Sequence, residues 1–318
     1  MQNLNNEEKL EYYKMHFDEK TKITEEKSIL DLRELSTMIK QLNCYIDGAL
    51  DLSLEKIDSI ISYFIKNFTI ILIFELKENI IIQRSRRFQE KTSTIAYCFN
   101  ELSELLYVPK NKKENIGLGR LNKVEEAIYY ASIETDATDI DNISLSEINA
   151  LEAEYINILS STVKKSLNVM HIGAFDLLVR NQPLPGWVDS FYKTAFDMLR
   201  DNCKKKKLKY YFDSYIICNA FLADVLKRKG SDRLYDVTSA IAKRLLDDEN
   251  TDAIVYESVQ VKDAPVIAIK TDIVDDHIEH NQVTCFKITE SLGYGLYYAD
   301  KINEASIINN ENKLVWEK

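Results

Sequence analysis

The sequence contains little histidine and none of the common short motifs of phosphate- or metal-binding enzymes. Only four histidines occur among 318 residues, so we do not expect a mechanism built on a histidine general base. The chain has no GxGxxG or Walker loop, no HExxH pair and no GxSxG elbow. The two commonest phosphate-binding loops are therefore excluded.

Paired cysteines and long apolar runs are also missing. The five cysteines are scattered, and no two have CxxC spacing, which indicates reduced thiols in a cytoplasmic protein and no zinc site. The most apolar run, residues 68–74, is far shorter than the roughly 20 residues of a membrane-spanning helix. The N-terminus is acidic through Glu7, Glu8 and Glu11, unlike a signal peptide. We expect a soluble cytoplasmic protein that does not bind a membrane.

Acidic residues outnumber basic ones. The net charge of −10 argues against a general nucleic-acid-binding protein. His277 and His280 are three residues apart among Asp275, Asp276 and Glu279, and they would form a metal-binding pair if this segment were helical. We favour a solvated, charged helix end and assign no metal.

Residues 1–78 have the apolar spacing of helices. One apolar stripe covers residues 29–46 and stops before Gly48, and a second covers residues 57–68 after Ser53. Such a helical hairpin buries one face of each helix. We predict a helical N-terminal domain without catalytic residues.

Residues 79–318 mix short strands with helices. The β-branched run at 80–82 leads into Arg84-Ser85-Arg86-Arg87, so we predict a strand that ends in positive charge. Further strands are predicted at 127–131, 155–160, 167–172, 253–256, 266–269 and 283–286, and helices at 144–154, 188–199, 215–226 and 237–246. Pro183-Leu184-Pro185-Gly186 is a dense turn signal. Without a regular alternation of strand and helix, the class is α+β.

The turn Gly119-Arg120-Leu121-Asn122 is the first candidate for ligand binding. Gly119 permits a tight turn, Arg120 offers a forked cation, and Asn122 can stabilise the turn. The strand that follows would place a tyrosine beside the arginine. A dinucleotide needs charge for its phosphates and a ring for its base, although a surface turn before a core strand has the same pattern.

Other polar residues lie at predicted strand and helix ends. Ser258 follows an apolar strand, where a serine ordinarily caps the strand or starts a turn. Glu147 would otherwise be a first-turn carboxylate favoured by the helix dipole. Neither residue identifies a reaction by itself.

The order of these motifs resembles the RES domain, a family named for its arginine, glutamate and serine. The likeness covers roughly residues 79–290, and its most specific part is Asp252-Ala253-Ile254-Val255-Tyr256-Glu257-Ser258-Val259-Gln260. The other matching motifs are Ile82-Gln83-Arg84-Ser85-Arg86, Tyr107-Val108-Pro109, Gly119-Arg120-Leu121-Asn122, Tyr129-Tyr130-Ala131-Ser132 and Ser144-Leu145-Ser146-Glu147-Ile148.

This resemblance implies a bacterial toxin with an ADP-ribosyltransferase-like core, which consumes NAD by hydrolysis or phosphorolysis and is silenced by a helix-turn-helix antitoxin. It carries over four catalytic positions and four NAD-binding ones. The catalytic positions are Arg120, Tyr130, Glu147 and Ser258, and the NAD-binding positions are Arg84, Arg86, Asn122 and Tyr256. No metal is implied.

Several alternatives stay open. Tyr129 is the less favoured choice of tyrosine, and Asp139 or Asp141 would replace Glu147 if no insertion follows Tyr130. The family's asparagine is missing near Pro265. An ADP-ribosyltransferase that modifies a protein, or a helical interaction protein with a degenerate RES domain, would fit the same sequence. A homo-oligomer is also compatible with it.

Overall fold

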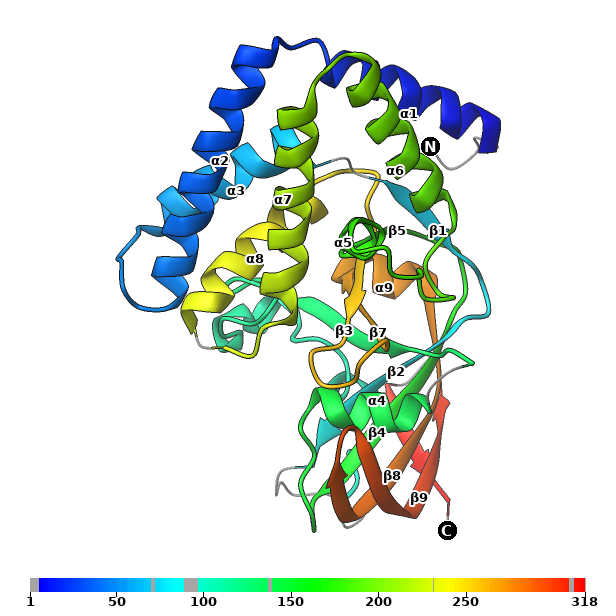
Figure 1. The fold of residues 1–318 in the computed structure, drawn as a ribbon. Helices are drawn as coiled ribbons and strands as arrows, with labels where there is room; N and C mark the ends of the chain where they lie inside the picture. The colour runs from blue at the N-terminus through cyan, green and yellow to red at the C-terminus, as the bar shows by residue number, and fades with distance from the viewer. Residues whose placement is uncertain are drawn as a thin grey trace. The chain divides into compact units, whose positions relative to one another are not determined.

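The computed structural model is an α+β protein, as the sequence predicts, and its strands form one ten-stranded sheet (Figure 1). It describes residues 6–69, 72–88, 97–136, 139–230, 232–308 and 312–317, so part of the apolar run at 68–74 lies outside the described residues. The order of the strands is β1-β5-β6-β7-β3-β2-β4-β8-β9-β10. None of the helices in these ranges is long and apolar enough to span a bilayer.

The chain forms two compact units that are interleaved in sequence. Unit 1 comprises residues 1–74, 118–123 and 170–254, and unit 2 comprises residues 75–117, 124–169 and 255–318. From the sequence we predict a single boundary, after residue 78. The helices at 170–254, which this boundary assigns to the second domain, belong to unit 1.

Unit 1 is mainly helical. Its helices are α1 (Asn6–Lys20), α2 (Glu25–Ile46), α3 (Leu54–Phe68), α5 (Ala174–Val179), α6 (Phe191–Lys205), α7 (Lys209–Lys227) and α8 (Asp232–Leu246). Thr24 and Ser53 cap α2 and α3 by accepting backbone N–H groups. The apolar stripe of α3 is buried through Ile57, Ile61 and Phe64. The two predicted N-terminal helices are confirmed.

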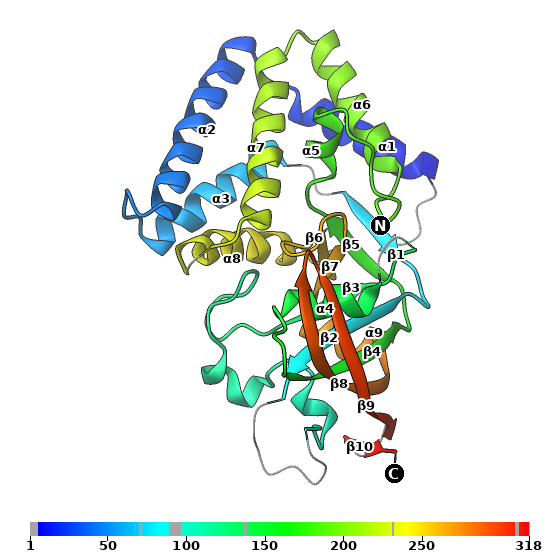
Figure 2. The same cartoon turned by 60° about the horizontal axis from the view of Figure 1, so that its bottom comes forward.

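Unit 2 contains most of the sheet. The strands of the whole sheet are β1 (Ile73–Leu76), β2 (Ile81–Arg87), β3 (Ile128–Ile133), β4 (Tyr155–Val163), β5 (Leu167–His171), β6 (Ala253–Glu257), β7 (Pro265–Lys270), β8 (Ile278–Gly293), β9 (Leu296–Ile308) and β10 (Lys313–Trp316). Its helices are α4 (Ile140–Glu147) and α9 (Thr271–His277), with 3₁₀ turns at Leu102–Glu104 and Lys110–Asn115. Strand β2 is antiparallel to β3 and β4, and β4 is antiparallel to β8 (Figure 2).

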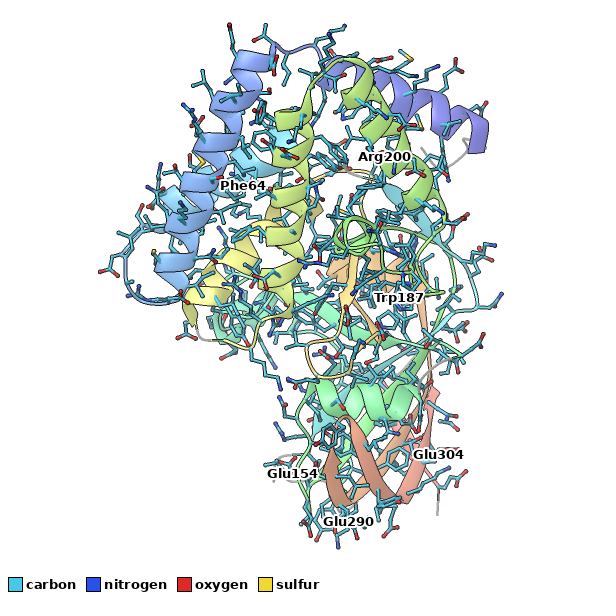
Figure 3. The ribbon with its side chains drawn as sticks, in the orientation of Figure 1. Phe64, Glu154, Trp187, Arg200, Glu290 and Glu304 are labelled. Carbon is cyan, nitrogen blue, oxygen red and sulfur yellow. The ribbon has the colours of Figure 1, made fainter. Side chains whose placement is uncertain are left out.

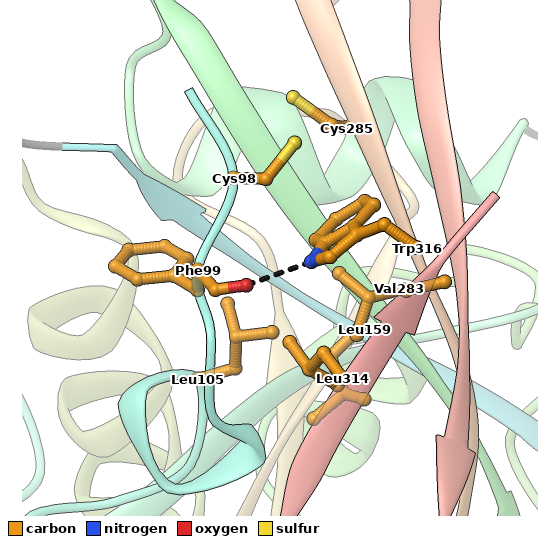
Figure 4. Packing of buried hydrophobic residues seen from close by; sticks show 9 residues of the cluster. Cys98, Phe99, Leu105, Leu159, Val283, Cys285, Leu314 and Trp316 are labelled. Carbon is orange, nitrogen blue, oxygen red and sulfur yellow. Dashed lines mark hydrogen bonds between the residues drawn. The ribbon is translucent and has the colours of Figure 1, made fainter. Parts of the chain in front are cut away.

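The two faces of this sheet have different surroundings. One face carries a core of Cys98, Phe99, Leu105, Leu159, Val283, Cys285, Ala305, Leu314 and Trp316 (Figure 4). The Trp316 indole Nε1 donates to the Phe99 carbonyl at 2.8 Å and fixes the last strand. The other face is covered by α4, whose Leu145 packs on Ile156 and Ile158 of β4. Because side chains alternate along a strand, each β2 residue belongs to one face or the other.

Two local predictions were wrong. A helix was predicted at 144–154, but α4 begins after Asp139 and ends at Glu147, and Asn149 follows with a left-handed φ of 49°. The run 283–286 was predicted to be the last strand, but it is the middle of β8, and β9 and β10 follow it.

Candidate active site

Ser258 lies just past β6 and is held by its own loop. Its side chain is buried, and its Oγ accepts the backbone N–H groups of Gln260 at 3.1 Å and Val261 at 3.0 Å. The Ser258 amide donates to the Ala264 carbonyl at 2.8 Å. Because these two amides occupy the lone pairs of Oγ, the hydroxyl proton points away from the loop, and the hydroxyl donates it to Oε1 of Glu147.

Glu147 is the last residue of α4 and is half-buried. Of the three acids considered from the sequence, it is the one hydrogen-bonded to Ser258. Asp139 is exposed and caps α4, because its Oδ1 accepts the Asp141 amide at 3.0 Å. Asp141 is half-buried, and burial raises its pKa, opposed by a hydrogen bond with Gln83. Asp139 and Asp141 therefore lie together at the start of α4, and Glu147 lies at its end.

The two adjacent tyrosines of β3 point to opposite faces of the sheet. The Ser85 hydroxyl of β2 bonds Ser144 of α4 at 2.6 Å, so Ser85 and Gln83, two residues before it, face α4. Gln83 pairs with Ser132 of β3, so Ser132 faces α4 as well. Tyr130, two residues before Ser132 and half-buried, lies on the same face. Tyr129 is completely buried on the other face. Tyr130 is thus the tyrosine that shares a face with α4.

Arg84 and Arg86 lie on the face opposite α4. The Arg84 guanidinium donates to the carbonyls of Leu105 at 2.9 Å and Tyr130 at 3.0 Å, and it lies 5.4 Å from the centre of the Tyr129 ring. Arg86 donates to the Glu104 carbonyl. Burial lowers the pKa of both arginines.

Among the residues that the structure describes, neither Arg84 nor Arg86 forms an ion pair with a carboxylate. Their neighbour Arg87 does, with its Nε 2.8 Å from Glu154. Half-buried guanidinium groups that are satisfied only by carbonyls keep their full positive charge. These two arginines are therefore candidates to hold an anionic group.

Arg120 and Asn122 lie in unit 1. The turn closes by a bond from the Gly119 amide to the Asn122 carbonyl at 3.0 Å, and a Cβ on Gly119 would lie 2.2 Å from Asn122 Oδ1. The Arg120 Nη1 donates to the carbonyls of Leu226 at 2.9 Å and Arg228 at 3.0 Å. In this structure the guanidinium therefore holds the C-terminal end of α7.

Tyr256 and the two clustered histidines complete the predicted set. Tyr256 is buried on β6, two residues before Ser258. His277 ends α9, but His280 lies in β8, where its Nδ1 is 2.8 Å from the Ser161 hydroxyl and burial lowers its pKa to about 4. The two histidines are therefore not one turn of a helix apart. The described residues contain no group of three or more side chains that could hold a metal ion.

One neighbour of the Ser258–Glu147 pair was not predicted from the sequence. At the tip of the β8–β9 hairpin, a Cβ on Gly295 would lie 2.7 Å from Val261 and 3.3 Å from Ser146. These residues adjoin Ser258 and Glu147 along the chain. Gly293-Tyr294-Gly295 is a turn signal that could have identified the hairpin.

No family model, no curated protein and no solved structure matches the chain.

Proposed function

We propose that this chain is an NAD-consuming enzyme of the RES, ADP-ribosyltransferase-like type. It would cleave the bond between nicotinamide and ribose by hydrolysis or phosphorolysis and act as a bacterial toxin that depletes NAD. The observation that carries the proposal is the hydrogen bond between Ser258 and Glu147, two candidate residues 111 positions apart in the chain. A serine and an acid chosen from distant motifs are in direct contact.

The chemistry of the reaction fits this pair. Nicotinamide leaves a cationic ring as a neutral group, so it needs no proton from a histidine. The transition state resembles an oxocarbenium ion, which a nearby carboxylate stabilises. Ser258 would hold Glu147 in position, and the carboxylate would bind the ribose. Tyr130, on the face covered by α4, would pack against nicotinamide.

Anion binding is proposed for the arginines, and for Arg84 and Arg86 this anion is not the phosphate of an NAD molecule that reaches Glu147 from the side of α4. Arg84 and Arg86 lack a carboxylate partner among the described residues of unit 2, which favours an anionic ligand. They lie on the face opposite Tyr130, so we treat their role as separate from that of the reacting pair. To bind a phosphate, the Arg120 guanidinium would have to break its hydrogen bonds to the carbonyls of Leu226 and Arg228.

The test is a product assay with purified protein and NAD alone. Release of nicotinamide should fall on the order of 10²-fold in Glu147→Gln and in Ser258→Ala, if each group contributes about 3 kcal/mol in the transition state. Glu152→Gln changes an exposed acid just past α4 and should retain full activity. Full activity in both site variants would exclude the assignment.

A protein ADP-ribosyltransferase is the second candidate. The observation that favours it is the exposed hairpin tip beside the pair, where Leu292, Tyr294 and Leu296 are at least 46% exposed. Large apolar side chains on a surface mark interaction sites, and a protein acceptor would have to approach this place. Label from NAD retained on a macromolecule would favour transfer, and free ADP-ribose as sole product would favour hydrolysis.

Toxicity separates both enzymes from a non-enzymatic interaction protein. Expression of an active NAD consumer should arrest growth, and expression of Glu147→Gln should not. A helix-turn-helix antitoxin should relieve the arrest. If both forms are harmless and NAD does not shift the melting temperature of either, the interaction protein is favoured.

A further inference from the structure

Unit 1 contains a cavity of about 890 Å³ that the proposed reaction does not use. It lies among the end of α5, the loop at 181–186, α6 and α7, and Figure 3 labels Arg200 of α6. Sites for small molecules typically measure roughly 300–1,000 Å³. The volume thus fits a small molecule better than a segment of another protein.

The walls of the cavity are mostly apolar and partly rigid. Buried Phe196 and Val188 contribute to them, together with the half-buried side chains Leu178, Val179, Leu184, Phe212 and Ile216. Pro183 and Pro185 fix φ in the loop that forms one side. Apolar side chains left half-buried around a cavity are stabilised when an apolar ligand covers them.

The charges at the cavity come from one stripe of α6. Lys193, Asp197 and Arg200 follow each other at steps of four and three residues. Arg200 is paired with Asp197 at 2.9 Å and with Asp201 at 3.4 Å. Lys193 is exposed, and no ion pair to it occurs in the described part of the chain. An uncompensated positive charge therefore borders an apolar cavity in a protein whose net charge is −10.

We propose that this cavity binds a small amphipathic carboxylate, with its apolar body against Leu184 and Phe212 and its carboxylate beside Lys193. One uncompensated cation matches a single negative charge and is too little for a polyphosphate, which requires several donors. The site is independent of the proposed NAD chemistry, because all of its lining residues belong to unit 1.

The experiment measures binding of decanoate, below its micelle concentration, to the full chain by titration calorimetry. Decanol, with the same tail but no charge, is the matched ligand. Lys193→Ala should weaken decanoate about fivefold, the upper range for an exposed ion pair, and leave decanol unchanged. Lys204→Ala removes an exposed lysine of the same helix outside the cavity and should change neither.

A second variant tests the apolar wall. Leu184→Glu should weaken both ligands on the order of tenfold, because it removes apolar contact from a half-buried loop position without disturbing the helices. Unchanged melting curves would show that both variants are folded. Absence of decanoate binding to the unmodified chain, or equal decanoate affinity in the unmodified chain, Lys193→Ala and Leu184→Glu, would overturn the proposal.

Discussion

Replacing Ser258 by alanine should lower the free energy of unfolding of unit 2 by about 1.5–3 kcal/mol. The hydroxyl donates to the half-buried carboxylate of Glu147, and a hydrogen bond to a charged group contributes about that much. The amides of Gln260 and Val261 also lose their acceptor. Both residues are only half-buried, so water can replace the serine there, and most of the loss comes from Glu147.

The chain offers a direct assay because it has two tryptophans, one in each unit. Trp187 belongs to unit 1, and Trp316 of β10 belongs to unit 2. In a Trp187→Phe background, urea denaturation followed by fluorescence reports the packing of Trp316 on Phe99. The fluorescence change then reports the loss of structure around Trp316 in unit 2.

A double-mutant cycle isolates the contact from the separate effects of each substitution. Ser258→Ala and Glu147→Ala, each of which removes one partner of the hydrogen bond, are measured alone and together. If the hydrogen bond exists, the coupling free energy should be about 1 kcal/mol or more. Additivity within about 0.5 kcal/mol would refute the contact, and with it the observation on which the proposed function depends. Glu152→Ala with Ser258→Ala is the matched control and should be additive, because Glu152 is exposed.

Three further predictions concern other sites. Burial lowers the pKa of His171 to about 4 from an ordinary value of 6.5. The unfolded chain therefore binds the proton first as pH falls through 6.5, and the free energy of unfolding of unit 1 should fall by about 2 kcal/mol between pH 7 and pH 5. In denaturation curves at the two pH values, His171→Asn should abolish this loss. Arg120→Ala should destabilise unit 1 by about 1.5–3 kcal/mol, because two carbonyls at the end of α7 lose a charged donor; unchanged denaturation in a Trp316→Phe background would contradict this. Gly295→Ala should lower the free energy of unfolding by about 1 kcal/mol or more beyond the effect of Gly293→Ala. Both glycines have a φ of 75°, but only at Gly295 would a Cβ lie 2.7 Å from Val261. Equal melting temperatures of the two variants would contradict the close packing of the hairpin tip.

The helices were predictable because their signals are local. The stripe of α3 repeats at helical spacing, and Ser53 stands at its N-cap. The long strands β8 and β9 were not predictable in this way. Strand β8 includes exposed polar positions such as Glu279, Asn281 and Gln282, so it has no continuous apolar run outside 283–286. Its pairing with β4 and β9 is what makes the segment a strand.

The candidate site was predictable only in part, for a similar reason. The sequence identifies Ser258 and Glu147 as polar residues at the ends of elements, but their contact depends on where α4 crosses the sheet. The local pattern also does not show that the Arg120 guanidinium bonds the carbonyls of Leu226 and Arg228, which are more than 100 residues away in the chain. Long-range contacts of this kind come from tertiary packing alone.

The motifs that resemble one continuous site divide between two faces of a sheet. Tyr130 lies on the side covered by α4, the helix that carries Glu147, while Arg84 and Arg86 lie on the other side. Strand β2 is an interior strand between β3 and β4, so a ligand cannot contact both faces through it. An NAD molecule that reaches Glu147 from the side of α4 must therefore take its phosphate contacts from other residues. Arg84 and Arg86, which form no ion pair with the described residues, then need a separate explanation. They would either bind an anion of their own or be held by carbonyls, with Arg84 also held by the Tyr129 ring.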